Sequence, residues 1–144
     1  MGANAALEYD QGIDVTLTFA VANPAANATT ALTLAQGNTV GFVVPSGYRF
    51  HAIAISGASN ADLTAGTATF VVRSLTAAGG SAATVAGLSA ALSDTVQGAS
   101  GTANVGACTV AAGSAVGVAV VTDASYAPVT ADLDCVLIGK ILPA

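Results

Sequence analysis

Short runs of strand-forming residues, separated by turn-forming residues, recur along the whole chain of 144 residues. The clearest run covers residues 14–21 (DVTLTFAV), where large apolar residues at odd positions alternate with polar or small residues at even positions. Alternation with a period of two places the apolar set on one face of a strand. Gly, Pro, Asn, Asp and Ser between the runs are typical of turns. The pattern therefore predicts an all-β chain of half-buried strands.

About eight such runs can be marked, at spacings of about 10 to 20 residues. They cover residues 14–21, 31–34, 39–44, 48–56, 66–74, 104–110, 115–121 and 131–141. This pattern predicts an antiparallel two-sheet sandwich, with a jelly roll as the leading topology. Because the length suits one domain, we expect a single domain over residues 13–144. Residues 1–12 include Glu8 and Asp10 but no core pattern, which predicts an N-terminal arm that grips neighbouring subunits.

The segment 76–100 is rich in Ala, Gly and Ser, and its pattern is ambiguous. Leu88 and Leu92 fit helical spacing together with Val85. The same two leucines form, with Ala90, the period-two pattern of a strand. We favour a strand because helix caps are missing and the neighbouring segments are β.

Two connections between runs have the composition of turns. Residues 36–38 (QGN) predict a bulge or a tight turn. Residues 45–48 (PSGY) predict a β-turn, in which Pro45 presets the first central torsion angle and Gly47 accepts a positive φ. A strand is expected to resume directly after this second turn.

Charged residues are scarce in this chain. Only 8% of residues are charged and 5% aromatic, although 53% are hydrophobic. Typical soluble domains carry about 25% charged residues, so much of this surface is expected to face other protein. No run approaches the roughly 18 apolar residues of a membrane-spanning helix, and we expect no membrane partner.

The formal net charge is −5, and the three positive side chains are Arg49, Arg73 and Lys140. Neutralising phosphates requires a basic surface, so we expect no nucleic-acid partner. Residues 1–12 lack both the basic region and the apolar run of a secretory signal. Synthesis in a cytoplasm is the expectation that follows.

The two cysteines, Cys108 and Cys135, are too few for a disulfide framework, and neither has a metal-ligand spacing. Both lie in predicted strands, where free cysteine is often a small buried residue. We favour two reduced core thiols, with a single disulfide as the open alternative.

The only histidine, His51, lies in a predicted strand, where alternation places it beside Arg49 on a face that continues into Ile53 and Ile55. A catalytic base needs a nucleophile or an orienting group within reach, and no Ser or Cys occupies a nucleophile-elbow sequence. We expect a structural role for His51, with a pH-dependent contact as the alternative.

Three carboxylates, Asp123, Asp132 and Asp134, cluster near the C-terminus, and the last two share a strand face. Calcium needs six or more oxygen ligands, and the loop lacks the spacing of a calcium-binding loop. We favour charges on a solvated strand edge, which discourage unwanted strand pairing, and cation binding stays the alternative.

Other site signals are weak. The glycines do not form a phosphate-binding loop, because no glycine cluster joins a strand to a helix before a lysine. A sugar-binding platform would require loop aromatics such as Tyr126 to cluster, and core packing is favoured for most aromatic residues. We therefore expect no catalytic residue, no cofactor and no metal site, which makes an enzyme the weakest hypothesis.

Several turns flanked by strands follow one another between residues 40 and 141. They are residues 44–48 (VPSGY), 63–67 (LTAGT), the 112–113 turn before Val116, and residues 123–132 with Ala127 and Pro128 inside. Their order resembles small bacteriophage virion proteins of the β-sandwich kind, which include capsid decoration or cement proteins and head-fibre or tail-appendage domains. The resemblance implies a symmetric oligomer, a homotrimer, docked on a capsid or built into an appendage. It supplies no catalytic residues.

The leading hypothesis is a structural virion protein, assembled in the host cytoplasm, that acts as a capsid decoration subunit. Its expected partners are copies of itself and the major capsid protein or other virion proteins. Two alternatives stay open. One is a receptor- or carbohydrate-binding module of a fibre, using loops near residues 60–64 or 123–129, and the other is a filament subunit whose N-terminal segment joins a neighbour's sheet.

Overall fold

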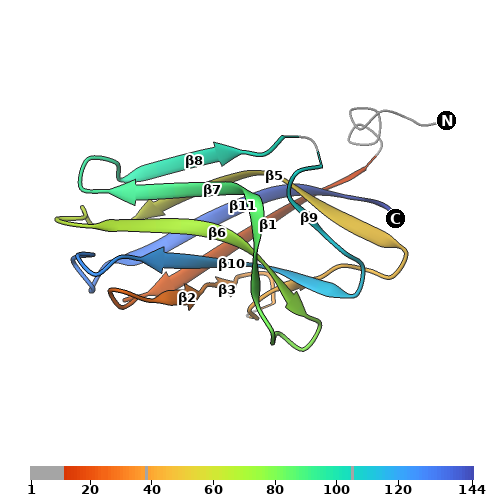
Figure 1. Ribbon diagram of the computed structural model, residues 1–144, viewed down its shortest axis with the longest axis horizontal. Coiled ribbons are helices and arrows are strands. Elements are labelled where there is room, and N and C mark those ends of the chain that lie inside the picture. The colour runs from red at the N-terminus through yellow and green to blue at the C-terminus, as the bar shows by residue number, and fades with distance from the viewer. Residues whose placement is uncertain (1–11, 38, 105) are drawn as a thin grey trace.

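The computed structural model describes residues 12–37, 39–104 and 106–144 (Figure 1). Within them it contains eleven strands and no helix, and so no helix that could cross a membrane. The strands are β1 (Ile13–Ala22), β2 (Thr29–Ala31), β3 (Thr33–Leu34), β4 (Phe42–Val43), β5 (Tyr48–Ser59), β6 (Thr67–Thr76), β7 (Ala83–Ser93), β8 (Gly98–Thr102), β9 (Thr109–Val110), β10 (Ser114–Thr122) and β11 (Asp132–Pro143). The predicted N-terminal arm lies outside the described residues except for Gly12.

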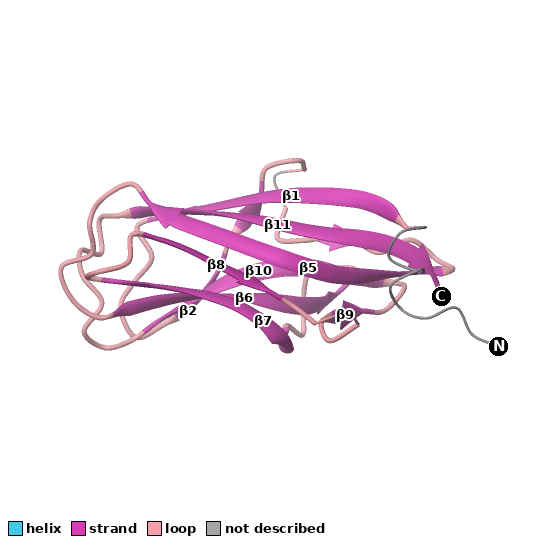
Figure 2. Cartoon of the chain, turned by 90° about the horizontal axis from the view of Figure 1, so that it is seen from above, coloured by secondary structure: helices cyan, strands magenta, loops and turns pink. Residues whose placement is uncertain are grey.

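The strands form two antiparallel sheets that face each other as layers (Figure 2). The first sheet has the order β3-β1-β11-β5-β8, with β9 also paired to β5, and the second has the order β2-β10-β6-β7, with β4 also paired to β10. The main pairs are nested along the chain: β6 with β7, β5 with β8, β2 with β10, and β1 with β11. Nested pairs that wrap across two sheets form a jelly roll. The predicted sandwich and its topology are confirmed.

The ambiguous segment 76–100 forms strands. Leu88, Ala90 and Leu92 are the buried positions of β7, so the period-two reading is confirmed. Tertiary packing explains why no helix forms, because β7 pairs with β6 and buries these residues against the core. The predicted strand 104–110 is shorter than expected, and only β9 forms there.

The turn at residues 45–48 forms, but its predicted geometry was partly wrong. Tyr48 N donates to Pro45 O at 3.1 Å, which makes Pro45 the first residue of the turn rather than its first central residue. Ser46 and Gly47 are the central residues, and Gly47 has a φ of 83°. Glycine suits this position because a positive φ strains a residue that carries a Cβ.

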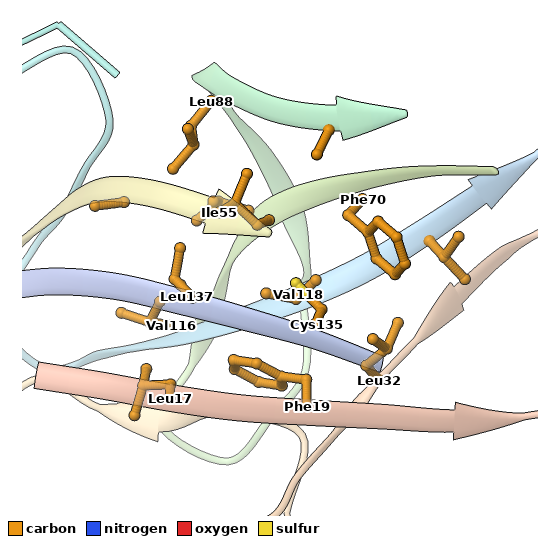
Figure 3. Close-up of a cluster of buried hydrophobic side chains, with 14 of the residues drawn as sticks. Leu17, Phe19, Leu32, Ile55, Phe70, Leu88, Val116, Val118, Cys135 and Leu137 are labelled. Atoms are coloured by element: carbon orange, nitrogen blue, oxygen red, sulfur yellow. The ribbon is translucent and has the colours of Figure 1, made fainter. Parts of the chain in front are cut away.

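Apolar side chains of both sheets fill the space between the layers. Phe19 of β1 and Phe70 of β6 are fully buried, and Figure 3 shows them near Cys135 and Leu137 of β11. Val15, Leu17, Phe19 and Val21 of β1 either belong to this core or pack against it, as their alternation predicts, whereas Ile13 at the start of β1 is exposed. Each fully buried side chain of this size stabilises the fold by about 1.5–3 kcal/mol.

Candidate functional site

His51 lies on β5 and is only 6% exposed. Arg49 Nε donates to His51 Nε2 at 2.8 Å, and the hydroxyl of Thr109 lies 3.4 Å from His51 Nδ1. Thr109 belongs to β9, which also pairs with β5 at His51. The imidazole therefore lies among side chains of two adjacent strands.

The prediction that the face of His51 continues into Ile53 and Ile55 was wrong, because the alternation shifts after Ala52. Ala52 pairs with Gly139 and Ala54 with Ile138, which leaves Ile53 as an extra residue in β5. This β-bulge shifts the alternation by one residue. Ile55 is consequently buried in the core, whereas His51 and Arg49 lie on the outer side of the sheet.

The three aspartates do not form one cluster. Asp132 and Asp134 lie on the outer side of β11, and Asp123 follows β10, where it accepts hydrogen bonds from Ser125 N at 3.1 Å and from the hydroxyl of Thr67 at 3.2 Å. Within the described ranges, no group of three His, Cys, Asp or Glu side chains could hold a metal ion. The predicted strand-edge position was also wrong, because β11 lies between β1 and β5.

Tyr126 packs inside the core and is 2% exposed. Burial raises the pKa of its hydroxyl above the ordinary value. An aromatic ring in this position cannot stack on a sugar at the surface. The structure therefore removes Tyr126 as the contact residue of a carbohydrate-binding loop.

Cys108 and Cys135 are both buried and carry free thiols. Burial raises the pKa of Cys108 to about 11. For Cys135, burial and the nearby carboxylate of Asp134 raise the pKa to about 12, against a smaller opposing effect of a backbone hydrogen bond from Ser56. Both residues belong to the hydrophobic core, which confirms the prediction that they are small buried residues.

We expect neither thiol to react with a chromogenic disulfide reagent at about pH 8 while the protein is folded, because thiolate is scarce and access is closed. Both should react at once in guanidinium. An unfolded thiol ionises near its ordinary pKa of 9.0, below the folded values, so the free energy of unfolding should fall as the pH rises above 9.0. Fast labelling of either cysteine in native buffer would contradict the buried placement.

The outer side of the first sheet is a broad uncharged surface. We call its central part the first-sheet face. It consists of the outward side chains of Thr16, Thr18, Ala54, Ser56, Ser100, Thr102, Val136 and Ile138. Ile138, at its centre, is 44% exposed, and Val136 lies beside it on the same side of β11. No local sequence pattern marks this face, because its members lie on four separate strands.

The outer side of the second sheet is different. Ala115 and Ala119 of β10 point outward but are 2% exposed. The backbone near Val40 lies against β10 at Gly117, where an added Cβ would come within 2.7 Å of Val40 O. Arg73 of β6 also places a positive charge on this side and donates to Ala82 O at 3.1 Å. This surface is thus partly covered by the chain itself and interrupted by a charge.

No family model matches the chain, and no curated protein sequence matches it. Among solved structures, the acidic stable capsid of the Helicobacter pylori bacteriophage KHP30 is similar at 12% identity, over 92% of this chain and 90% of that chain, with a TM-score of 0.49. The capsid asymmetric unit of cyanophage Pam1 has 21% identity, 92% and 86% coverage and a TM-score of 0.47. The globular domain of zebrafish complement 1qA has 15% identity, 89% and 96% coverage and a TM-score of 0.45. Similarity at this level concerns the fold alone.

Proposed function

We propose that this chain is a structural subunit of a virus particle, and specifically a capsid decoration protein that stabilises the shell by added contacts. The observation that carries the proposal is the first-sheet face, which has no charged side chain and has Val136 and Ile138 at its centre. The sequence has eleven charged side chains, and the solvent-accessible surface area of the protein is 6690 Å². Permanent interfaces are more apolar than transient ones, and burial of such a surface is the mechanism that the proposal requires.

The proposal includes no catalytic step. The one histidine, His51, lies on β5 and contacts the side chains of Arg49 and Thr109. The buried thiols of Cys108 and Cys135 have raised pKa values, which is the reverse of what a nucleophilic cysteine needs. The assignment of the chain to a virion relies on the order of its turns along the sequence, which resembles that of phage β-sandwich proteins.

A filament built by strand addition has less support from the structure. Such a mechanism needs an open strand edge, and beyond β3 the edge of β1 is occupied by a side chain. Gln36 Nε2 donates to Thr16 O at 3.3 Å, and Gln36 Oε1 accepts from Thr18 N at 3.2 Å. The amide of Gln36 thus satisfies two of the backbone groups that a strand added at β1 would use.

Particle association tests the proposal. We expect the chain to co-sediment with purified virus particles of its source in a density gradient and to be visible on the shell by electron microscopy. Particles that lack it should rupture at a lower temperature than particles to which the purified chain has been added back. A small soluble protein taken through the same gradient is the control. Absence of the chain from purified particles would refute the virion assignment.

A further inference from the structure

The first-sheet face consists of two uncharged rows that cross the strands. The ladder places Ile138 of β11 between Thr16 of β1 and Ala54 of β5, and it places Val136 between Thr18 and Ser56. Strand β8 extends the two rows with Thr102 and Ser100. Small side chains surround the two larger apolar ones, so the face is apolar at its centre and free of charge across its width.

Charges of opposite sign flank these rows at the two ends of the strands. Lys140 lies at one end, 3.3 Å from the exposed carboxylate of Asp14, and Arg49 lies on the same side of the neighbouring β5. Asp132 and Asp134 lie at the other end of β11. Along β11 the outward residues therefore run from negative, through apolar, to positive.

We propose that the first-sheet face is an interface between two copies of this chain. The two-fold axis lies in the interface, runs perpendicular to the strands and crosses β11 between Val136 and Ile138. Each strand then lies antiparallel over the same strand of the partner, with Val136 of one protomer against Ile138 of its partner. Lys140 then faces Asp134 of the partner, and the symmetry repeats both contacts. A two-fold interface requires a self-complementary surface, and this face has that property.

The charge pattern favours this dimer over a trimer whose three-fold axis runs parallel to the strands. A parallel packing would bring the Asp132 and Asp134 ends of all copies together, and like charges across an interface are unfavourable. The antiparallel packing joins opposite charges instead. The surface thus favours a dimeric contact over the homotrimer that the resemblance implies.

The size of the face suits a specific contact. Three strands of about nine residues and the five-residue β8, spaced about 4.8 Å apart, cover about 510 Å² per copy. Two copies would bury about 1,000 Å² in total, which is about the area expected of a specific interface. In the existing pair between Lys140 and Asp14, the aspartate is 83% exposed, which weakens the pair, whereas the lysine side chain is only 19% exposed.

Charge reversal with rescue tests the interface in the full chain. The wild type should be a dimer by analytical ultracentrifugation and native mass spectrometry at protein concentrations of about 100 μM. Lys140→Glu alone and Asp134→Lys alone should each raise the dissociation constant about tenfold or more, because each change creates two repulsive contacts. The double variant restores opposite charges and should return to within about threefold of the wild type.

Two further variants separate the interface from folding. Ile138→Asp places a charge at the centre of the face and should leave only monomer, with an unchanged circular dichroism spectrum. Val121→Asp makes the matched change on the outer side of the second sheet, where Val121 is 38% exposed, and should leave the dimer intact. A monomeric wild type, a trimer that survives Ile138→Asp, or a double variant that fails to recover would each overturn the proposal.

The virion assignment and this interface can fail separately. Loss of the dimer in Ile138→Asp with continued binding to particles would leave the assignment standing. A dimer that behaves as expected but never associates with particles would leave the interface standing.

Discussion

Replacement of Gly57 by alanine should lower the free energy of unfolding by about 3 kcal/mol, at the upper end of the usual cost of overpacking a core. Gly57 lies on β5, and Phe70 lies opposite it on β6, across the space between the sheets. An added Cβ would come within 2.2 Å of Cε2 and 2.5 Å of Cδ2 of the Phe70 ring, which is itself fully buried. Either the ring or the sheet must move, and urea unfolding would measure the cost.

Gly98→Ala is the matched control for this variant. Gly98 lies on β8 opposite Ala58 of β5, and the nearest atom to its added Cβ, Gly57 O, is 3.9 Å away. Its stability should equal or slightly exceed that of the wild type. Phe70→Leu combined with Gly57→Ala should cost less than the sum of the two single changes, since the smaller side chain relieves the clash. A fully stable Gly57→Ala variant would contradict the close approach.

Replacement of Thr122 by valine should cost about 2 kcal/mol, because two backbone groups lose a buried partner. Thr122 is 4% exposed at the end of β10. Its hydroxyl donates to Ala25 O at 2.6 Å and accepts from Ala28 N at 3.1 Å. These bonds fix the connection between β1 and β2, and valine has the same shape without the hydroxyl. The midpoint of urea unfolding should fall with little change in its slope.

Thr122→Ser keeps the hydroxyl and should lose clearly less stability than the valine variant. Thr102→Val on the first-sheet face is the matched control, since Thr102 is exposed, and its unfolding free energy should change by less than about 0.5 kcal/mol. Equal midpoints for Thr122→Val and Thr102→Val would show that the hydroxyl does not hold the connection.

Local pattern predicted most of the strands. Residues 14–21 form part of β1 with the expected inward face, and Leu88, Ala90 and Leu92 are buried as a strand requires. These predictions succeeded because one buried face imposes a period of two on the residues of a strand. The scarcity of charge is also visible in the sequence, and a surface that contacts other protein stays a prediction.

Other features depended on pairing between distant segments. The bulge at Ile53 moves Ile55 to the core and leaves His51 on the outer side, and no local signal marks the residue at which alternation shifts. Tyr126 lies in a loop by sequence, yet the closing of the two sheets buries it. The position of β11 at the interior of its sheet likewise removed the expected edge role of Asp132 and Asp134.

Alternation and turn residues act within a few positions of one another, and they were enough to predict the antiparallel β-sandwich. The outward order of β11, from Asp132 through Ile138 to Lys140, is also present in the sequence. Strand pairing, in contrast, places β1 and β5 beside β11, and it therefore extends the apolar centre of β11 into an uncharged face. Pairing between β1, β11 and β5 joins residues at least 74 positions apart, and such long-range registers depend on the packing of the whole core.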